Sequence, residues 1–167
     1  MEHATILCSG NSIQQESGAY GMDIIAGLQS KNNTEAYQLL LLLEKESEES
    51  DGLYTYFSDF LQLLKSKNAY IRTRGFRMVC AQARWDTANQ LDANLCGILA
   101  SLDGEKPTAV RQRLAALHQV LDCKPYLSAQ IEEKIAALDL TKYKESMRPL
   151  IEKDIRELQN WGKEPSE

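Results

Sequence analysis

The phrase Ala-Tyr-Ile-Arg-Thr-Arg-Gly-Phe-Arg-Met-Val at residues 69–79 recurs in altered form as Thr-Ala-Val-Arg-Gln-Arg-Leu-Ala-Ala-Leu-His at residues 108–118. When Ile71 is placed over Val110, an arginine follows in both copies, and a second arginine follows two residues later. The copies are 39 residues apart (110 − 71). A period of this length is typical of stacked pairs of helices. The repeat therefore predicts an all-α fold built from such pairs.

Length and composition agree with a short helical array. The chain has 167 residues, of which 43% are hydrophobic and 26% are charged, so it is expected to fold rather than to be disordered. Its longest apolar run, residues 39–43, is far shorter than the roughly 20 residues that cross a membrane. Residues 1–8 lack the basic and apolar parts of a signal peptide. No membrane partner is predicted.

The cysteines indicate neither metal binding nor a disulfide framework. Cys8, Cys80, Cys96 and Cys123 have no C-x-x-C spacing, and the chain has only two histidines. Metal sites usually need closely spaced ligand pairs, so no metal and no cofactor are predicted. Cys80 and Cys96 lie inside apolar helical patterns and are expected to be buried free thiols. This usage favours a reducing cytoplasm.

From Met22 onward, apolar residues recur at helical spacing. Eight helices in four antiparallel pairs are predicted, at residues 22–31, 34–47, 53–64, 69–84, 87–102, 107–122, 125–138 and 145–161. Pairs joined by short loops bury their apolar stripes only by stacking on neighbouring pairs. The predicted organisation is an irregular lead-in at 1–21, one domain at 22–161 and a frayed tail at 162–167.

The two phrases carry a family resemblance. Ile71-Arg72 and Val110-Arg111 resemble the second-helix signature of HEAT-type repeats, and Met147-Arg148 is similar to a third copy. The run at 69–77 also resembles a group of small bacterial HEAT-like proteins without assigned function. The resemblance implies a right-handed α–α superhelix, a HEAT-like solenoid, in which the second helix of each pair lines the concave side. It implies no activity.

Charge is distributed unevenly over these helices, although the net charge is only −5. Three of the four predicted second helices carry positive charge, +4 at 68–85, +3 at 106–124 and +2 at 142–156, whereas the second helix of the first pair carries −4 at 34–50. The predicted first helix at 86–105 carries −4. If the second helices line a concave side, they form a basic groove, which attracts partners of opposite charge. The leading hypothesis is a non-enzymatic interaction scaffold that binds an acidic protein or peptide in this groove.

The arginines are expected to fall into two groups, one that contacts neighbouring repeats and one that contacts the partner. Arg72 and Arg111, at the signature position, are expected to form a structural ladder between repeats, with Asp86 and Asp103 as available acids. The residues expected to bind the partner on the concave face are Arg74, Arg77, Arg84, Trp85, Arg113 and Arg148.

Two alternatives remain open. Trp85 and Asp86 beside a basic face are similar to features of HEAT-like DNA alkylation-repair glycosylases, which predicts a nucleic-acid partner, although a pI of about 5.2 argues against strong backbone binding. The exposed end of a short solenoid is also expected to be able to dock a second copy. Four tyrosines lie near helix starts, and exposure of several would favour a recognition surface: Tyr37, Tyr70, Tyr126 and Tyr143.

Overall fold

The computed structural model describes residues 23–163, so the predicted lead-in at 1–21 and most of the predicted tail lie outside the described part. Within that range the chain forms eight helices and no strand, which confirms the all-α class. A short helix at 23–28 comes first. The others are α3 (Asn33–Glu49), α4 (Phe57–Leu63), α5 (Ala69–Ala81), α6 (Gln90–Ala100), α7 (Pro107–Cys123), α8 (Ser128–Ala136) and α9 (Arg148–Gln159). Three 3-10 turns accompany them, at Tyr54–Tyr56, Ala83–Trp85 and Pro125–Leu127.

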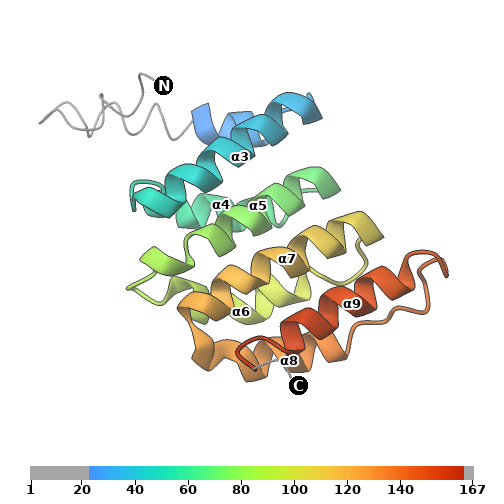
Figure 1. Ribbon diagram of the computed structural model, residues 1–167. Helices are drawn as coiled ribbons and strands as arrows, with labels where there is room; N and C mark the ends of the chain where they lie inside the picture. Colours follow the sequence, from blue (N-terminus) through green and yellow to red (C-terminus); the bar gives the residue numbers. More distant parts are fainter. Residues whose placement is uncertain (1–22, 164–167) are drawn as a thin grey trace, which may run out of the picture.

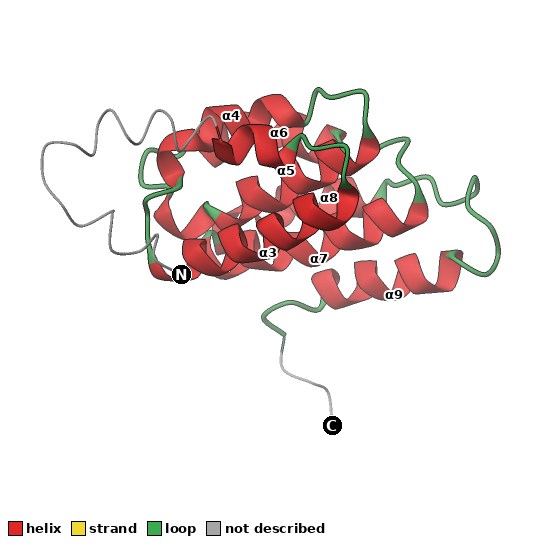
Figure 2. Ribbon diagram, turned by 90° about the horizontal axis from the view of Figure 1, so that it is seen from above, coloured by secondary structure: helices red, strands yellow, loops and turns green. Residues whose placement is uncertain are grey.

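The helices form two layers. In Figure 1, α3, α5, α7 and α9 lie side by side in chain order and run in the same direction, with their N-termini toward the right of the view. Helices α4, α6 and α8 lie behind them, and Figure 2 shows the two layers from above. Contacts between α3 and α5, between α5 and α7, and between α7 and α9 hold the front layer together. Residues far apart in the chain thereby become neighbours, from 33 residues for Arg77 and Glu44 to 43 residues for Arg111 and Asp154.

Local sequence explains where the front helices begin. Helices α5 and α7 start at the predicted residues, Ala69 and Pro107. Asn68 caps α5 through a 2.9 Å hydrogen bond from the backbone N–H of Tyr70, and Pro107 has the backbone φ that a first helical position needs. Helix α3 starts at Asn33 rather than Thr34, because the Asn32 side chain accepts the N–H of Glu35. Helix α9 starts at Arg148 rather than 145, after a turn.

One continuous hydrophobic core lies between the layers and extends from Ile24 to Leu158. The backbones of α4 and α5 approach closely at Gly75. A Cβ placed on Gly75 would lie 2.6 Å from the Cβ of Leu63 and 2.9 Å from the carbonyl oxygen of Phe60. Since both neighbours are attached to the α4 backbone, the two helices would have to move apart. Gly75 therefore sets the distance between the layers in the second pair.

We expect Gly75→Ala to destabilise the protein by about 2 kcal/mol or more, because overpacking forces the backbone to shift. Gly97→Ala is the matched control, since Gly97 also lies within a helix but a Cβ there meets nothing within 4 Å. The control should be neutral or gain about 0.5–1 kcal/mol from helix propensity and lower unfolded-state entropy. Urea denaturation of the two variants measures the difference. Equal effects would contradict the close packing of α4 on α5.

Candidate functional site

The first arginine of each repeated phrase contacts the following helix pair. Arg72 of α5 donates from Nε to Glu105 Oε1 at 2.6 Å and from Nη2 to Glu105 Oε2 at 3.1 Å. Arg111 of α7 pairs with Asp154 of α9 at 2.6 Å. Glu105 and Asp154 therefore accept these arginines, whereas Asp86 and Asp103 were the expected acids.

The second arginine of each phrase contacts the preceding pair. Arg74 donates to the carbonyl oxygen of Leu28 at 2.8 Å and to Asn33 Oδ1 at 2.7 Å. Arg113 donates to Thr73 Oγ1 at 3.0 Å and to the carbonyl oxygen of Ser101. Two residues along an α-helix are separated by about 200° around its axis. The two arginines of one phrase must therefore point to opposite sides of their helix.

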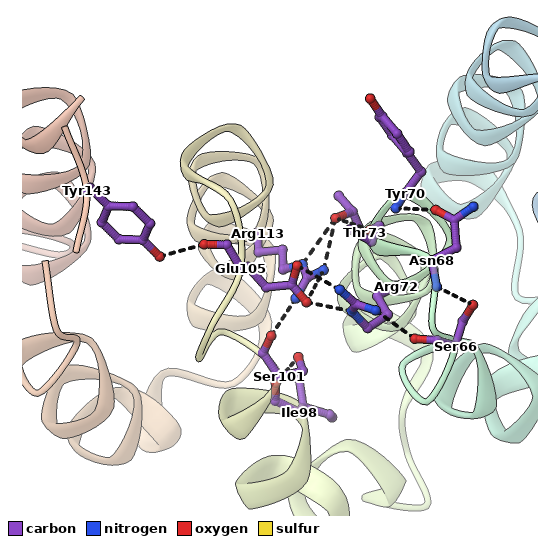
Figure 3. A network of polar contacts seen from close by, with 11 residues as sticks. Ser66, Asn68, Tyr70, Arg72, Thr73, Ile98, Ser101, Glu105, Arg113 and Tyr143 are labelled. Carbon is purple, nitrogen blue, oxygen red and sulfur yellow. Dashed lines mark hydrogen bonds and ion pairs between the residues drawn. The ribbon is translucent and has the colours of Figure 1, made fainter. Parts of the chain in front are cut away.

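Glu105 joins Arg72 of α5 and Arg113 of α7 in one network, shown in Figure 3. Its carboxylate pairs with Arg72 and, at 3.2 Å, with Arg113, while its carbonyl oxygen accepts the Tyr143 hydroxyl at 2.8 Å. Burial by itself would raise the pKa of Glu105, but the hydrogen bonds and charges of the two arginines outweigh burial, so the pKa lies below its usual value. Burial lowers the pKa of Arg113, and Glu105 opposes that effect. Glu105 thus links α5, α7 and the loop before α9.

The network corrects the prediction of an open basic groove. Arg113 is 0% exposed and Arg74 is 4% exposed, so neither lies at the solvated position that was expected. Arg77 is partly exposed, but it pairs with Glu44 of α3 at 2.6 Å and donates to Gln112 of α7. The guanidinium groups are held by separate partners rather than gathered in one hollow.

The other residues expected to bind the partner also contact the fold itself. Arg84 and the Trp85 indole donate at 2.6 Å to the carbonyl oxygens of Glu48 and Ser47, in the last turn of α3. Arg148 donates to the carbonyl oxygen of Tyr143 at 2.8 Å. The last four carbonyls of a helix have no partner within that helix. Arg84 and Trp85 thus satisfy acceptors that helix geometry leaves open.

Asp86, which supported the nucleic-acid alternative, is buried in a second polar cluster. It accepts the backbone N–H groups of Gln90 and Leu91, at 2.9 and 2.8 Å, and so caps the start of α6. It also pairs with buried Lys124, which contacts Asp92 at 2.8 Å. Burial would lower the pKa of Lys124, but these carboxylates and Tyr126 raise it above its usual value. The cluster links the start of α6 to the segment between α7 and α8.

The described surface instead has a hollow of about 390 Å³ across the first turns of α3, α5 and α7. It lies toward the right of the front layer in Figure 1. Two exposed tyrosines line it: Tyr37 is 48% exposed and Tyr70 is 62% exposed. The lining residues are Asn33, Thr34, Tyr37, Ala69, Tyr70, Thr73, Arg74, Lys106, Thr108, Ala109 and Gln112.

The charged side chains that line the hollow are both cations, Arg74 and Lys106. Lys106 lines it, is exposed and forms no ion pair within residues 23–163. Helix α7 begins there without a side-chain cap, so the N–H groups of Thr108 and Ala109 have neither a cap nor an intrahelical acceptor. Three parallel helices also direct the positive ends of their dipoles toward this end of the layer.

A shallower hollow of about 250 Å³ continues the surface along α5 and α7. It shares Gln112 with the first hollow and is lined by Arg77, Ala115 and Gln119. The Arg77 guanidinium lies 5.7 Å from the centroid of the Tyr37 ring, so this tyrosine is positioned between the two hollows. Together they form an elongated surface, which we call the α3–α5–α7 groove.

Sequence reasoning found part of this groove. It noted Tyr37 and Tyr70, and both are exposed; Tyr126 is 63% exposed as well, whereas Tyr143 is buried. It missed Lys106, Thr108 and Gln112. Their signal was available, since Pro107 predicts a helix start and the Lys106 side chain has no oxygen that could cap it. Of the thiols expected to be buried, Cys80 is buried, but Cys96 is exposed because it lies on the solvent side of α6.

The described residues also bear on metal binding and on membrane insertion. No group of three or more His, Cys, Asp or Glu side chains is arranged to hold a metal ion there. None of the helices described is long and apolar enough to cross a membrane. Comparisons of the chain with protein-family models, with curated proteins and with solved structures found no match. The HEAT-type resemblance stays a prediction from the two phrases.

Glu105→Gln should lower the free energy of unfolding by about 2–4 kcal/mol at pH 7, because it leaves Arg113 buried without a charged partner. A carboxyl with a depressed folded pKa stabilises fully above its unfolded pKa and loses that stabilisation as the pH falls through the folded value. The difference in the free energy of unfolding between wild type and variant should therefore become smaller below about pH 4.5, which is the ordinary pKa of a Glu carboxyl. Urea denaturation between pH 7 and pH 3 measures it.

Glu133→Gln, at an exposed position on α8, is the matched control and should be nearly neutral at every pH. If the difference in the free energy of unfolding between wild type and Glu105→Gln stays constant down to pH 3, the carboxylate charge contributes nothing to stability.

Proposed function

We propose that the protein is a non-enzymatic interaction scaffold that binds an acidic peptide segment of a partner protein in the α3–α5–α7 groove. We also propose that its helix pairs stack as a right-handed, HEAT-like superhelix. Parallel second helices in one layer, linked pair to pair by arginines of the repeated phrase, support the second proposal. The single observation that supports the binding function is the hollow at the N-termini of three parallel helices, with Lys106 unpaired and two tyrosines exposed.

The charge at the hollow favours a carboxylate. Lys106 provides a free cation, and the uncapped first turn of α7 provides two N–H donors. Arg74 borders the hollow and has carbonyl and amide partners but no carboxylate among residues 23–163. Backbone N–H groups at a helix start, a helix dipole and a cation each stabilise a nearby anion. An Asp or Glu side chain of a peptide matches this set.

The shape and the remaining side chains favour an extended peptide. Tyr37 and Tyr70 offer flat contact area at a low entropic cost, and residues of this kind are enriched where proteins bind proteins. The second hollow continues the surface for further residues along α5 and α7. A nucleic acid needs several cations along its phosphates. Among residues 23–163 the groove offers Lys106 as its exposed unpaired cation, because Arg77 is paired with Glu44 and Arg74 is buried.

The binding proposal is tested with two fluorescein-labelled ten-residue peptides, one rich in Glu with a single Leu and the other the same peptide with Lys in place of Glu. The Glu peptide should bind and should shift the backbone NMR signals of Tyr70, Thr108 and Gln112, whereas the Lys peptide should not. Lys106→Glu should weaken binding by about fivefold or more, since it replaces an attraction by a repulsion at a partly desolvated site. Fluorescence anisotropy measures the affinity.

Lys163→Glu makes the same change of charge after the end of α9, at the opposite end of the front layer, and should have little effect. The binding proposal fails if the Glu peptide shifts none of the three signals, or if both variants weaken it equally. A labelled single-stranded oligonucleotide that binds this groove more tightly than the Glu peptide would also overturn it, in favour of a nucleic-acid partner.

A further inference from the structure

Helix α3 ends the front layer, and no other described helix of that layer packs on its outward side. Helix α5 packs on its other side, and Figure 1 shows no described helix of the front layer beyond α3. Five exposed residues follow one another at steps of three or four along the outward side of α3, so they form one stripe. They are Glu35, Gln38, Leu42, Lys45 and Glu49. Leu42, near the middle, is 67% exposed, the largest value among the exposed large hydrophobic residues of the described chain.

The charges of this stripe have no partners in the described chain. Glu35, Lys45 and Glu49 form no ion pair there, and neither does Lys31, which is exposed just before the N-cap of α3. This differs from Glu44, on the α5 side of the same helix, which pairs with Arg77 at 2.6 Å. The stripe is thus an amphipathic surface whose charges are available to another molecule.

The order of the residues has a specific symmetry. Glu35 and Lys45 lie equally far from position 40, with opposite charges, and so do Lys31 and Glu49. Gln38 and Leu42 form the inner pair about the same position. If two copies of α3 lie antiparallel about a two-fold axis at position 40, each Glu35 faces a Lys45 and each Lys31 faces a Glu49. A two-fold interface requires this kind of self-complementary surface.

We propose that this α3 stripe is a homodimer interface, in which the stripes of two copies pack antiparallel about position 40. Leu42 contacts the aliphatic part of Gln38 of the other copy, and four ion pairs surround this centre. Opposite charges brought face to face fix the register and the orientation of a helix pair more than they add affinity. The contact surface is one helix wide, so the dimer is a weak one that forms at high protein concentration. The α3–α5–α7 groove lies toward α5 and stays open in the dimer.

A charge swap tests the register directly. Glu35→Lys and Lys45→Glu, each alone, convert two attractions into two repulsions and should weaken the dimer by about tenfold or more. The double variant Glu35→Lys/Lys45→Glu restores opposite charges across the axis and should return the dissociation constant to within about threefold of wild type. Analytical ultracentrifugation over a concentration series up to about 1 mM measures the constants.

The double variant also separates dimerisation from folding. A Lys in the first turn of α3 and a Glu near its C-terminal end both oppose the helix dipole, so the double variant should be the least stable fold of the set. If the double variant dimerises again, a more stable fold cannot be the reason. Thermal unfolding measures the stability of each variant. The control Lys163→Glu/Glu133→Lys makes the same changes of charge at exposed positions elsewhere and should leave the dissociation constant unchanged.

Three results would overturn the proposal. The first is a wild-type protein that stays monomeric at about 1 mM, because the dissociation constant would then be too large for a specific dimer. The second is a dimer whose double variant is as weak as the single variants, since the contact then lies on another face. The third is a monomer in which the Leu42 methyl groups show nuclear Overhauser effects to residues 1–22, which would assign the stripe to the chain's own N-terminal segment.

Discussion

The ion pairs that Glu105 forms with Arg72 and Arg113 are the interaction on which the rest of this structure depends. A buried guanidinium without a carboxylate is costly, and so is a buried carboxylate without a cation. Each charge is therefore stable in the interior only when α5 and α7 lie at their observed positions. Tyr143 extends the same constraint to the loop before α9. A few directional contacts thus fix how adjacent helix pairs stack. Apolar packing alone would define their relative position less specifically.

The arginine-rich character of the second helices serves this stacking. In both phrases the first arginine contacts the following pair and the second contacts the preceding pair. Several guanidinium groups also satisfy carbonyl oxygens at helix ends and in loops, as Arg84 does for α3 and Arg113 for α6. The arginines at 68–85 and 106–124 therefore serve mainly internal contacts, whereas the third positive segment keeps exposed cations at Lys142, Lys144, Lys153 and Arg156. At the starts of α3, α5 and α7, the accessible groups are the uncapped backbone donors of α7, Lys106 and two tyrosines.

The two surfaces proposed for partners among residues 23–163 differ in chemistry. The α3–α5–α7 groove combines cationic side chains with aromatic area, which suits an acidic peptide. The α3 stripe carries both signs of charge in a symmetric order, which suits a second copy of the chain. They lie on different sides of α3, so both can be occupied together. A two-fold dimer would then present two grooves, and a partner with two acidic segments would gain avidity from binding both.

The sequence by itself determined the helices, their order in pairs and the starts of α5 and α7, because helical period, caps and proline act within a few residues. It also indicated that Arg72 and Arg111 contact neighbouring pairs, and the two-residue spacing within each phrase was enough to exclude a shared groove for both its arginines. Only the tertiary structure decided which carboxylate each arginine meets, since Glu105 and Asp154 lie 33 and 43 residues away. The groove at Lys106 and the open side of α3 exist only after the layers pack. Their residues are local in sequence, but their exposure depends on what the rest of the chain covers.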